Sequence, residues 1–290
     1  MARIADRLPD NAPGDVYVDR TCIDCGTCRH VAPTVFAEGP DHSFVYAQPE
    51  DEASSLRARM AMVACPTSSI GSVSRADLRP AVAAFPEEVL PGVYYCGFAS
   101  PDSYGASAWL IRRPDGNVLV DSPRAAAPLL RRVEALGGVR WMVLTHRDDV
   151  ADHVLWARHF GAERILHAAD RTPGTADVER FVEGLAPVPL APDLTLIPLP
   201  GHTRGSMGLL YRDDVLFSGD HLWAESPGSP DLDASRRVCW YDWATQIRSM
   251  ETLLAPRFAH VLPGHGAPWH GGAAAKDAAL VALLGRMRAA

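Results

Sequence analysis

The sequence predicts an α/β protein of two domains, and three observations support this. From Val93 onward, short apolar strand-like runs alternate with helix-like segments. Four of the six cysteines lie before residue 70, whereas nine of the eleven histidines lie after residue 140. Two kinds of metal-binding side chain therefore occupy two parts of the chain. We expect a small cysteine-rich domain at residues 1–75, a linker at 76–91 and a larger domain at 92–290.

The linker is predicted from its three prolines, which interrupt regular structure between residues 76 and 91. The first element expected after it is a hairpin within residues 104–121, with the turn Pro114-Asp115-Gly116-Asn117. Apolar and β-branched runs predict further strands at 139–145, 163–167, 194–200, 215–220 and 258–264. Helices are expected at 124–136, 152–160 and 242–254, and at the C-terminus, where Leu280, Leu283, Leu284 and Met287 have the spacing of one helical face.

The composition limits the classes of function. The chain has 28 basic and 35 acidic residues, a formal net charge of −7, which argues against a nucleic-acid-binding surface. No apolar run approaches the roughly 18 residues that would cross a membrane. The first residues also lack the apolar core of a signal peptide. We therefore expect a cytoplasmic protein that acts on a small molecule, without a nucleic acid or a membrane as partner.

The cysteines of the first part have the spacing of an iron–sulfur site. Cys22, Cys25 and Cys28 form a CxxCxxC motif, and Cys65 is followed by Pro66. Such a loop can place three thiolates around one cluster, and a distant Cys-Pro supplies the fourth. A structural zinc site is the alternative, but it usually has paired CxxC motifs. Disulfides are rare in a cytosolic protein.

The text CIDCGTCRHVAPTVF and the later ACPTSSI make residues 15–73 resemble the single-cluster bacterial ferredoxins. The resemblance implies a small α+β ferredoxin-like domain with one cluster, held by Cys22, Cys25, Cys28 and Cys65. Because Cys25 is present, a [4Fe–4S] cluster is favoured over a three-iron form. Such a cluster could exchange electrons with a redox partner protein, sense redox state, or only stabilise a domain too small for a large core.

Histidines and aspartates follow several predicted strands in the second part. His146 ends the run VRWMVLTH, His202 lies in PGHTRGS, Asp220 ends FSGD and His265 lies in PGHG. A further pair, Asp152-His153, begins a predicted helix. Loops at strand ends are where a sheet scaffold places a functional site. We therefore expect these side chains to converge on a metal.

This order of motifs resembles the metallo-β-lactamase superfamily over about residues 90–270. The resemblance implies an αββα sandwich with one or two metals, zinc or iron, at one edge of the sheets. The metal ligands implied by the resemblance are His146, Asp152, His153, His202, Asp220 and His265, and we add Asp148 for the reason given below. Two of the histidines, His146 and His202, would bind the first metal, and Asp220 would bridge both metals. The second metal would be bound by Asp152, His153 and His265. Asp121 would lie near the site and orient the ligands without binding a metal itself.

One departure from the family pattern concerns the first metal. The family usually has H-x-H-x-D-H, whereas this chain has His146-Arg147-Asp148-Asp149-Val150-Ala151-Asp152-His153, two residues longer and without the second histidine. We expect Asp148, or else Asp149, to replace it. Oxygen ligands favour iron or manganese but do not exclude zinc. If neither aspartate binds, the protein would hold one metal or none.

The resemblance implies a metal-dependent hydrolase, in which a metal-bound hydroxide attacks an ester, thioester, lactone or amide. Asp220 and the adjacent His221 are the candidate catalytic residues, and the alternative for His221, a side chain that packs at the strand end, is favoured over a catalytic role. One alternative is a diiron oxidoreductase that receives electrons from the [4Fe–4S] cluster. A second is a redox-sensing module without catalysis. Trp223 and Trp240 could form a substrate pocket or pack against the following helix.

Overall fold

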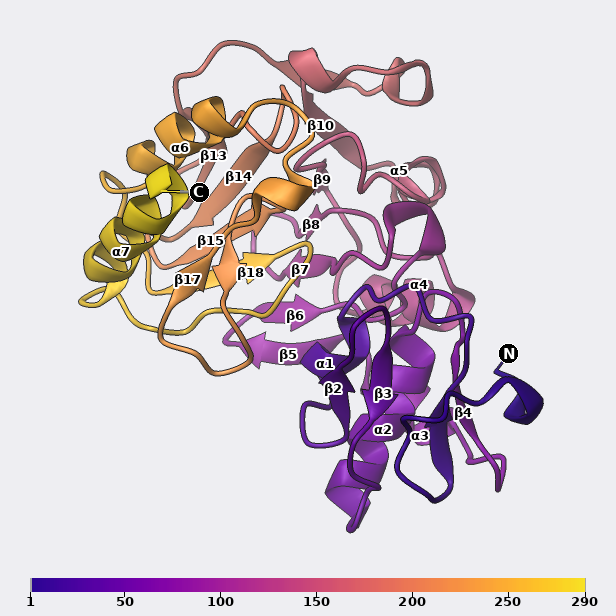
Figure 1. Ribbon diagram of the computed structural model, residues 1–290. Coiled ribbons are helices and arrows are strands. Elements are labelled where there is room, and N and C mark those ends of the chain that lie inside the picture. The colour runs from indigo at the N-terminus through magenta and orange to yellow at the C-terminus, as the bar shows by residue number, and fades with distance from the viewer. Residues whose placement is uncertain (1, 290) are drawn as a thin grey trace.

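The computed structural model describes residues 2–289 and places two β-sheets face to face between two layers of helices (Figure 1). This is the αββα arrangement expected for the larger part of the chain. The cysteine-rich part, residues 2–75, lies beside the sandwich, at the lower right of Figure 1. Among the described residues, no helix is long and apolar enough to cross a membrane.

Within residues 2–289, the first sheet has seven strands in the order β11-β10-β9-β8-β7-β6-β5. Their bounds are β5 Glu87–Leu90, β6 Val93–Tyr95, β7 Trp109–Ile111, β8 Val118–Val120, β9 Trp141–Val143, β10 Glu163–His167 and β11 Arg180–Val182. Strands β5 to β8 pair antiparallel, and β8 to β11 pair parallel. The pair β7 and β8 is the predicted hairpin. Because β8 and β9 run in the same direction, Asp121 and the residues after β9 leave the sheet at the same edge.

The second sheet has five strands in the described chain, in the order β12-β13-β14-β15-β18. Their bounds are β12 Val188–Ala191, β13 Leu194–Pro198, β14 Met207–Tyr211, β15 Val215–Gly219 and β18 His260–Pro263. Only β15 and β18 pair parallel. Asp220 and His265 therefore follow neighbouring strand ends. Gly219 has φ +52, and a Cβ there would lie 2.5 Å from the Thr145 hydroxyl, so the two sheets are in close contact where the predicted metal ligands begin.

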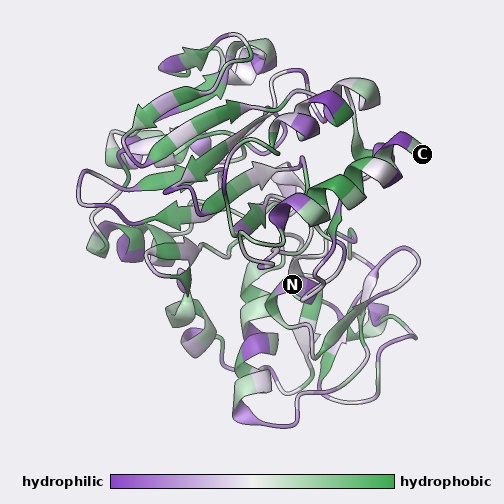
Figure 2. Cartoon of the chain, turned by 90° about the vertical axis from the view of Figure 1, so that its left-hand side faces the viewer, coloured by the Kyte–Doolittle hydropathy of each residue, from purple (hydrophilic) through white to green (hydrophobic). Residues whose placement is uncertain are grey.

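Helices cover the outer faces of both sheets (Figure 1). Those beside the first sheet are α4 Ala127–Ala135 and α5 His153–Phe160, and those beside the second are α6 Trp243–Thr252 and α7 Lys276–Ala289. The predicted apolar face of α7 is confirmed, because Leu280, Leu283, Leu284 and Met287 are all buried. Figure 2 shows the strands of the sandwich as mainly hydrophobic and the helices as mixed, which is the pattern of a core between two covered sheets. A small antiparallel pair, β16 Trp223–Ala224 and β17 Leu232–Asp233, lies beyond β15.

The cysteine-rich part is built from two short strand pairs and two helices. The strands β1 Val16–Val18 and β4 Ile70–Ser72 pair antiparallel, as do β2 Phe36–Glu38 and β3 Ser43–Val45. Helix α1 spans Thr27–Val31 and α2 spans Glu52–Ala64. Asp51 and Ser54 form a capping box that begins α2, and Cys65 is its C-terminal cap, directly before Pro66. The end of α2 therefore determines where the fourth cysteine lies.

The segment predicted as a linker contains regular structure. Helix α3 spans Arg79–Ala84, and β5 joins the edge of the first sheet by pairing with β6. The Arg57 guanidinium of α2 lies 2.5 Å from the Glu87 carboxylate of β5. The division of the chain at 75 and 92 remains a prediction.

One apolar core runs through both parts of the molecule. It extends from Val16 and Val31 in the cysteine-rich part to Trp109 and Leu262 in the two sheets. Half-buried His30 packs edge-on to the rings of Tyr95 and Trp109, with centroids 5.0 and 6.1 Å away. The Ala99 amide also donates to the carbonyl of Ala64, at 3.2 Å. The two parts are therefore packed directly on each other.

Candidate iron–sulfur site and metal centre

The four predicted cluster ligands come together in the cysteine-rich part. All are free thiols that line one enclosed cavity: Cys22, Cys25, Cys28 and Cys65. Arg29 donates to the Asp24 carboxylate at 2.6 Å and to the Ser43 hydroxyl at 2.8 Å, which holds the loop closed around the cavity. Burial raises the pKa of the Cys28 thiol to about 12, so without iron this thiol is protonated. Four convergent thiols around an enclosed space fit a [4Fe–4S] cluster, whose irons would bind them as thiolates.

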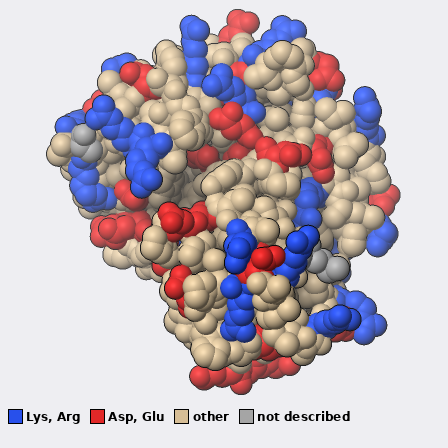
Figure 3. All heavy atoms as spheres, turned by 45° about the vertical axis from the view of Figure 1, so that its right-hand side comes forward, with Lys and Arg blue, Asp and Glu red and all other residues tan. Residues whose placement is uncertain are grey.

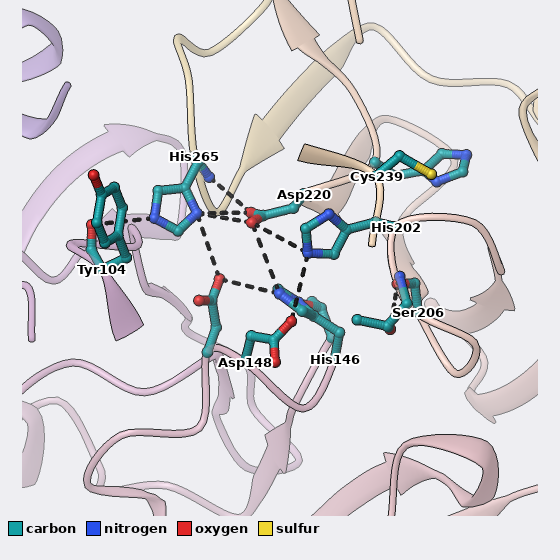
Figure 4. Close-up of polar contacts among 12 residues, drawn as sticks. Tyr104, His146, Asp148, His202, Ser206, Asp220, Cys239 and His265 are labelled. Atoms are coloured by element: carbon teal, nitrogen blue, oxygen red, sulfur yellow. Dashed lines mark hydrogen bonds and ion pairs between the residues drawn. The ribbon is translucent and has the colours of Figure 1, made fainter. Parts of the chain in front are cut away.

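The predicted histidine and aspartate ligands of the second part meet at the edge of the sandwich (Figure 4). His146 follows β9, His202 follows β13, Asp220 follows β15 and His265 follows β18. The Oδ2 atom of Asp220 lies 3.8 Å from His146 Nε2, 3.7 Å from His202 Nε2 and 2.9 Å from His265 Nδ1. Asp220 therefore lies in contact range of all three histidines, where a bridging ligand would be.

Both aspartates of the altered motif face this group. Asp148 Oδ2 lies 3.8 Å from His202 Nε2, and Asp149 Oδ2 lies 3.8 Å from His146 Nε2 and 3.9 Å from His265 Nδ1. Two overlapping triads result, each with its ligand atoms within 4.8 Å of one another: His146, Asp148 and His202, and His146, Asp149 and Asp220. The first triad contains Asp148, the residue predicted to replace the missing histidine; that replacement remains a prediction.

The donor atoms of this group fit a bound cation. Of the buried side-chain atoms without a hydrogen-bond partner among the described residues, four belong to this group: His146 Nε2, Asp149 Oδ2 and both ring nitrogens of His202. Buried polar atoms are normally paired, because an unpaired one keeps its desolvation cost. Imidazole nitrogens and carboxylates are the ligands that zinc and iron accept in proteins. These side chains therefore suit one or two divalent metals, and the open pairing of their atoms is what a metal would satisfy.

The structure gives Asp152 and His153 partners other than the second metal that was predicted for them. Asp152 begins helix α5, and its Oδ2 accepts from the Ala125 amide at 2.7 Å. His153 Nδ1 lies 3.2 Å from the guanidinium of buried Arg164. The two additional residues of the motif move this pair onto the first turn of the helix. Asp149 takes the position beside Asp220 instead.

His221 also faces away from the triads. Its side chain is buried against helix α6, with Nε2 3.4 Å from the Ser249 hydroxyl, and its carbonyl accepts from the Gln246 side-chain Nε2 at 3.1 Å. Burial lowers the pKa of His221 to about 3, so the ring is neutral. These contacts match the packing alternative for His221.

Two further carboxylates hold the ligand loops. The Thr145 hydroxyl donates to Asp121 Oδ2 at 3.0 Å and can accept from His146 Nδ1 at 3.0 Å, which leaves His146 Nε2 free to bind a metal. Asp170, fully buried, accepts from the amides of Arg147 at 3.0 Å and Gly205 at 2.7 Å. It thereby ties the loop of His146 to the loop of His202. Asp170 was not predicted, because it follows β10 without any motif of its own.

The buried carboxylates of this group need a positive charge nearby to compensate them. Burial, followed by the negative charge of Asp220, raises the pKa of the Asp149 carboxyl well above its usual range. Burial disfavours the imidazolium of His265, but Asp220 and Asp149 outweigh this and raise the pKa of His265 to about 10. A protonated His265 thus compensates the carboxylates. A divalent cation would supply that charge in its place.

Family comparisons agree with both sites. Residues 18–72 match the 4Fe-4S single cluster domain of Ferredoxin I, and residues 96–257 match the metallo-beta-lactamase superfamily. The second match covers more than half of the chain. The chain belongs to the metallo-β-lactamase superfamily. The resemblances stated for both parts of the sequence are confirmed.

Among curated relatives of this superfamily member is the hydroxyacylglutathione hydrolase of Acidiphilium cryptum (strain JF-5), which is 36% identical over 124 residues, 40% of this chain and 49% of the relative. The chain thus spans about half the length of the curated relatives it matches. The solved DIM-1 metallo-beta-lactamase has a TM-score of 0.52 at 15% identity and covers 70% of this chain and 94% of its own. FIM-1 from Pseudomonas aeruginosa gives 0.50 at 18%, with 69% and 93% covered. At these identities the two structures show the shared fold.

In this superfamily member, the metal centre opens into a cavity of about 1570 Å³ that the two parts of the chain enclose together. Its lining includes Cys25 and Arg29 from the cluster loop, Tyr104, and the aromatic side chains of Trp223 and Trp240. The cavity is therefore large enough for a small-molecule substrate. Figure 3 shows a hollow above the cysteine-rich part, with acidic side chains around it.

We expect Thr145→Val to weaken metal binding by about 10- to 100-fold, as is typical for the loss of a group that orients a metal-binding histidine. Valine keeps the volume of threonine but cannot accept from His146 Nδ1 or donate to Asp121. The measurement is zinc affinity by competition with a chromogenic chelator. Thr195→Val, on β13 and partly exposed, is the matched control. Equal affinity in both variants would contradict the role assigned to Thr145.

Proposed function

We propose that this protein is a metal-dependent hydrolase that cleaves an ester, thioester, lactone or amide of a small molecule. The observation that carries the proposal is the group of buried donor atoms without partners, which opens into the cavity. Bound divalent metals would polarise the substrate carbonyl and activate a water for attack. The family membership agrees with this chemistry.

Some side chains at this centre would bind the metal ions, and others would position the substrate. Asp220 belongs to the second triad and also lies 3.7 Å from His202 of the first, so it would contribute to binding both ions. Asp148 and Asp149 would each complete one triad. Trp240 is largely exposed, and its ring centroid lies 6.2 Å from that of His202, so it forms an apolar wall beside the first triad. A substrate with an apolar group next to its carbonyl would pack on this wall.

The name of the Acidiphilium cryptum relative supports a thioester among the candidate substrates. The decisive experiment is anaerobic purification, metal analysis and assay against ester, thioester, lactone and amide substrates. We expect about four irons from the cluster together with one or two zinc ions. Chelation of the second metals should abolish hydrolysis, and zinc should restore it. Full metal occupancy without turnover of any substrate class would refute the hydrolase.

A diiron oxidoreductase is the second candidate, and the ligand set favours it. Three of the six side chains at the centre are carboxylates, Asp148, Asp149 and Asp220, which suit iron better than an all-histidine site would. The cluster loop also lines the same cavity. In this case metal analysis would give about six irons in total, with the second site reducible through the cluster. About four irons and two zinc ions would exclude it.

We predict that Asp148→Asn and Asp149→Asn each remove one of two bound metals, because each aspartate belongs to a different triad. Asparagine keeps the size of the side chain but loses its charge. Metal content per chain, measured by mass spectrometry after dialysis, checks the assignment. Asp115→Asn, in the exposed hairpin turn, is the control. Retention of both metals in either variant would show that this aspartate is not a ligand.

A further inference from the structure

One loop touches both inorganic sites. This bridging loop, residues 100–107, connects β6 to β7 and includes the short 3-10 helix Pro101–Ser103. Tyr104 has φ +48 and Gly105 has φ +89, so two consecutive residues are held in the left-handed region. A non-glycine residue there needs support from its surroundings. For Tyr104 that support comes from the two sites on either side.

On one side the loop packs against the cluster ligands. A Cβ on Gly105 would lie 2.7 Å from both Cβ and Sγ of Cys25, so the backbone touches this ligand directly. The Thr27 hydroxyl donates to the Gly105 carbonyl at 2.9 Å and lies 3.2 Å from Cys25 Sγ. The Tyr104 hydroxyl donates to the Ile23 carbonyl. The loop is thus attached to the cluster-binding segment at three points.

On the other side the loop orients a predicted metal ligand. His265 Nε2 lies 3.3 Å from the carbonyl oxygen of Tyr104, and its Nδ1 lies 2.9 Å from Asp220 Oδ2 (Figure 4). The Ser107 amide donates to the Gly264 carbonyl at 2.7 Å. A metal-binding histidine usually donates its second N–H to a carboxylate or a backbone carbonyl, which fixes the ring. Tyr104 supplies such a carbonyl, and Nδ1 is left to face the metal.

We propose that the bridging loop makes metal binding at His265 depend on an intact cluster. The cluster holds Cys25, Cys25 supports the Gly105 backbone, and the adjacent Tyr104 carbonyl fixes the His265 ring. Loss of the cluster frees the segment 22–28, the loop relaxes, and His265 no longer faces Asp220 and Asp149. Tyr104 is therefore a positioning residue. This inference rests on the proposed function for its metal centre, and it gives the hydrolase a dependence on cluster integrity.

The first test compares Co²⁺ binding to cluster-loaded and cluster-free wild-type protein, followed by the visible spectrum of the bound cobalt. We expect removal of the cluster to lower the affinity for one of two cobalt ions by about 10- to 100-fold and to leave the affinity for the other unchanged. Circular dichroism shows whether the cluster-free protein stays folded. Identical cobalt binding in the two folded forms would overturn the proposal.

The second test keeps the cluster and breaks its connection to the loop. Thr27→Val removes the hydrogen bond to Gly105 at nearly constant volume, and Gly105→Ala places a methyl group against Cys25. Both substitutions should lower the affinity for the same cobalt ion, while the iron content stays at about four per chain. Gly184→Ala is the matched control, since Gly184 has φ +79 and no atom within 4 Å of a Cβ. If the cluster-free protein unfolds, unchanged cobalt binding in Thr27→Val overturns the proposal.

The outcome is separable from that of the hydrolase proposal, because cobalt binding is measured without a substrate. Cluster-dependent cobalt binding in a protein that hydrolyses nothing would refute the hydrolase and retain the coupling. Hydrolysis that persists with unchanged cobalt affinity after cluster removal would retain the hydrolase and refute the coupling.

Discussion

Asp220→Asn is expected to lower the hydrolytic rate by about a thousandfold, because metal-ion assistance contributes several kcal/mol and about 4 kcal/mol corresponds to that factor. Asp220 Oδ2 is within 3.8 Å of both His146 Nε2 and His202 Nε2, so its charge serves both triads. Asparagine preserves the shape but removes that charge. The measurements are kcat/KM and metal content per chain.

Glu134→Gln, an exposed acid on α4, is the control for a change of net charge alone. It should keep both the rate and the metal content. A rate within tenfold of wild type in Asp220→Asn, with both metals retained, would show that Asp220 does not bridge the metals. Loss of metal in the control would mean that the effect is not local.

Cys65→Ser is expected to remove the cluster and to lower the thermal midpoint of the whole chain by about 10 °C or more. Metal binding in small domains contributes several kcal/mol to folding, and each kcal/mol corresponds to about 2–4 °C in a chain of this size class. The expected transition is single, because one apolar core extends from Val16 to Leu262. Visible absorption reports the cluster, and calorimetry reports the transition.

The matched control for this substitution is Cys239→Ser, which changes a partly buried thiol outside the cluster cavity. Its cluster absorption should equal that of the wild type. A full iron content in Cys65→Ser would refute the ligand assignment. Two separate transitions would show that the cysteine-rich part unfolds by itself.

Much of the fold could be predicted because its strands are short and are separated by recognisable turn residues. The run Glu163–His167 was expected as a strand and is β10, and the turn at 114–117 closes the predicted hairpin. The central strand β14, Met207–Tyr211, was not predicted, although all its residues are buried. Its sequence MGLLY contains a glycine and no β-branched residue, unlike the apolar runs from which the other strands were predicted.

The metal centre was predictable where the ligands lie in loops that directly follow strands. His146, His202, Asp220 and His265 come together because β9, β13, β15 and β18 place them at one edge. Asp152 and His153 were predicted from motif order, but helix α5 begins at this pair and directs it to Ala125 and Arg164. Spacing along a loop does not determine which residue reaches inward. The contact between Gly105 and Cys25 was also beyond prediction, because it joins segments 80 positions apart.

The packing of His30 on Tyr95 and Trp109 has a consequence for how such proteins can be recombined. His30 lies in the cysteine-rich motif, whereas its partners Tyr95 and Trp109 lie outside the histidine and aspartate motifs by which the second half is identified. A ferredoxin-like segment transplanted from another chain could carry all four cysteines and still leave Tyr95 and Trp109 uncovered. A chimaera made by exchanging one half would then lack surface complementarity at this contact. Substitutions on one side of the contact would need compensating substitutions on the other side.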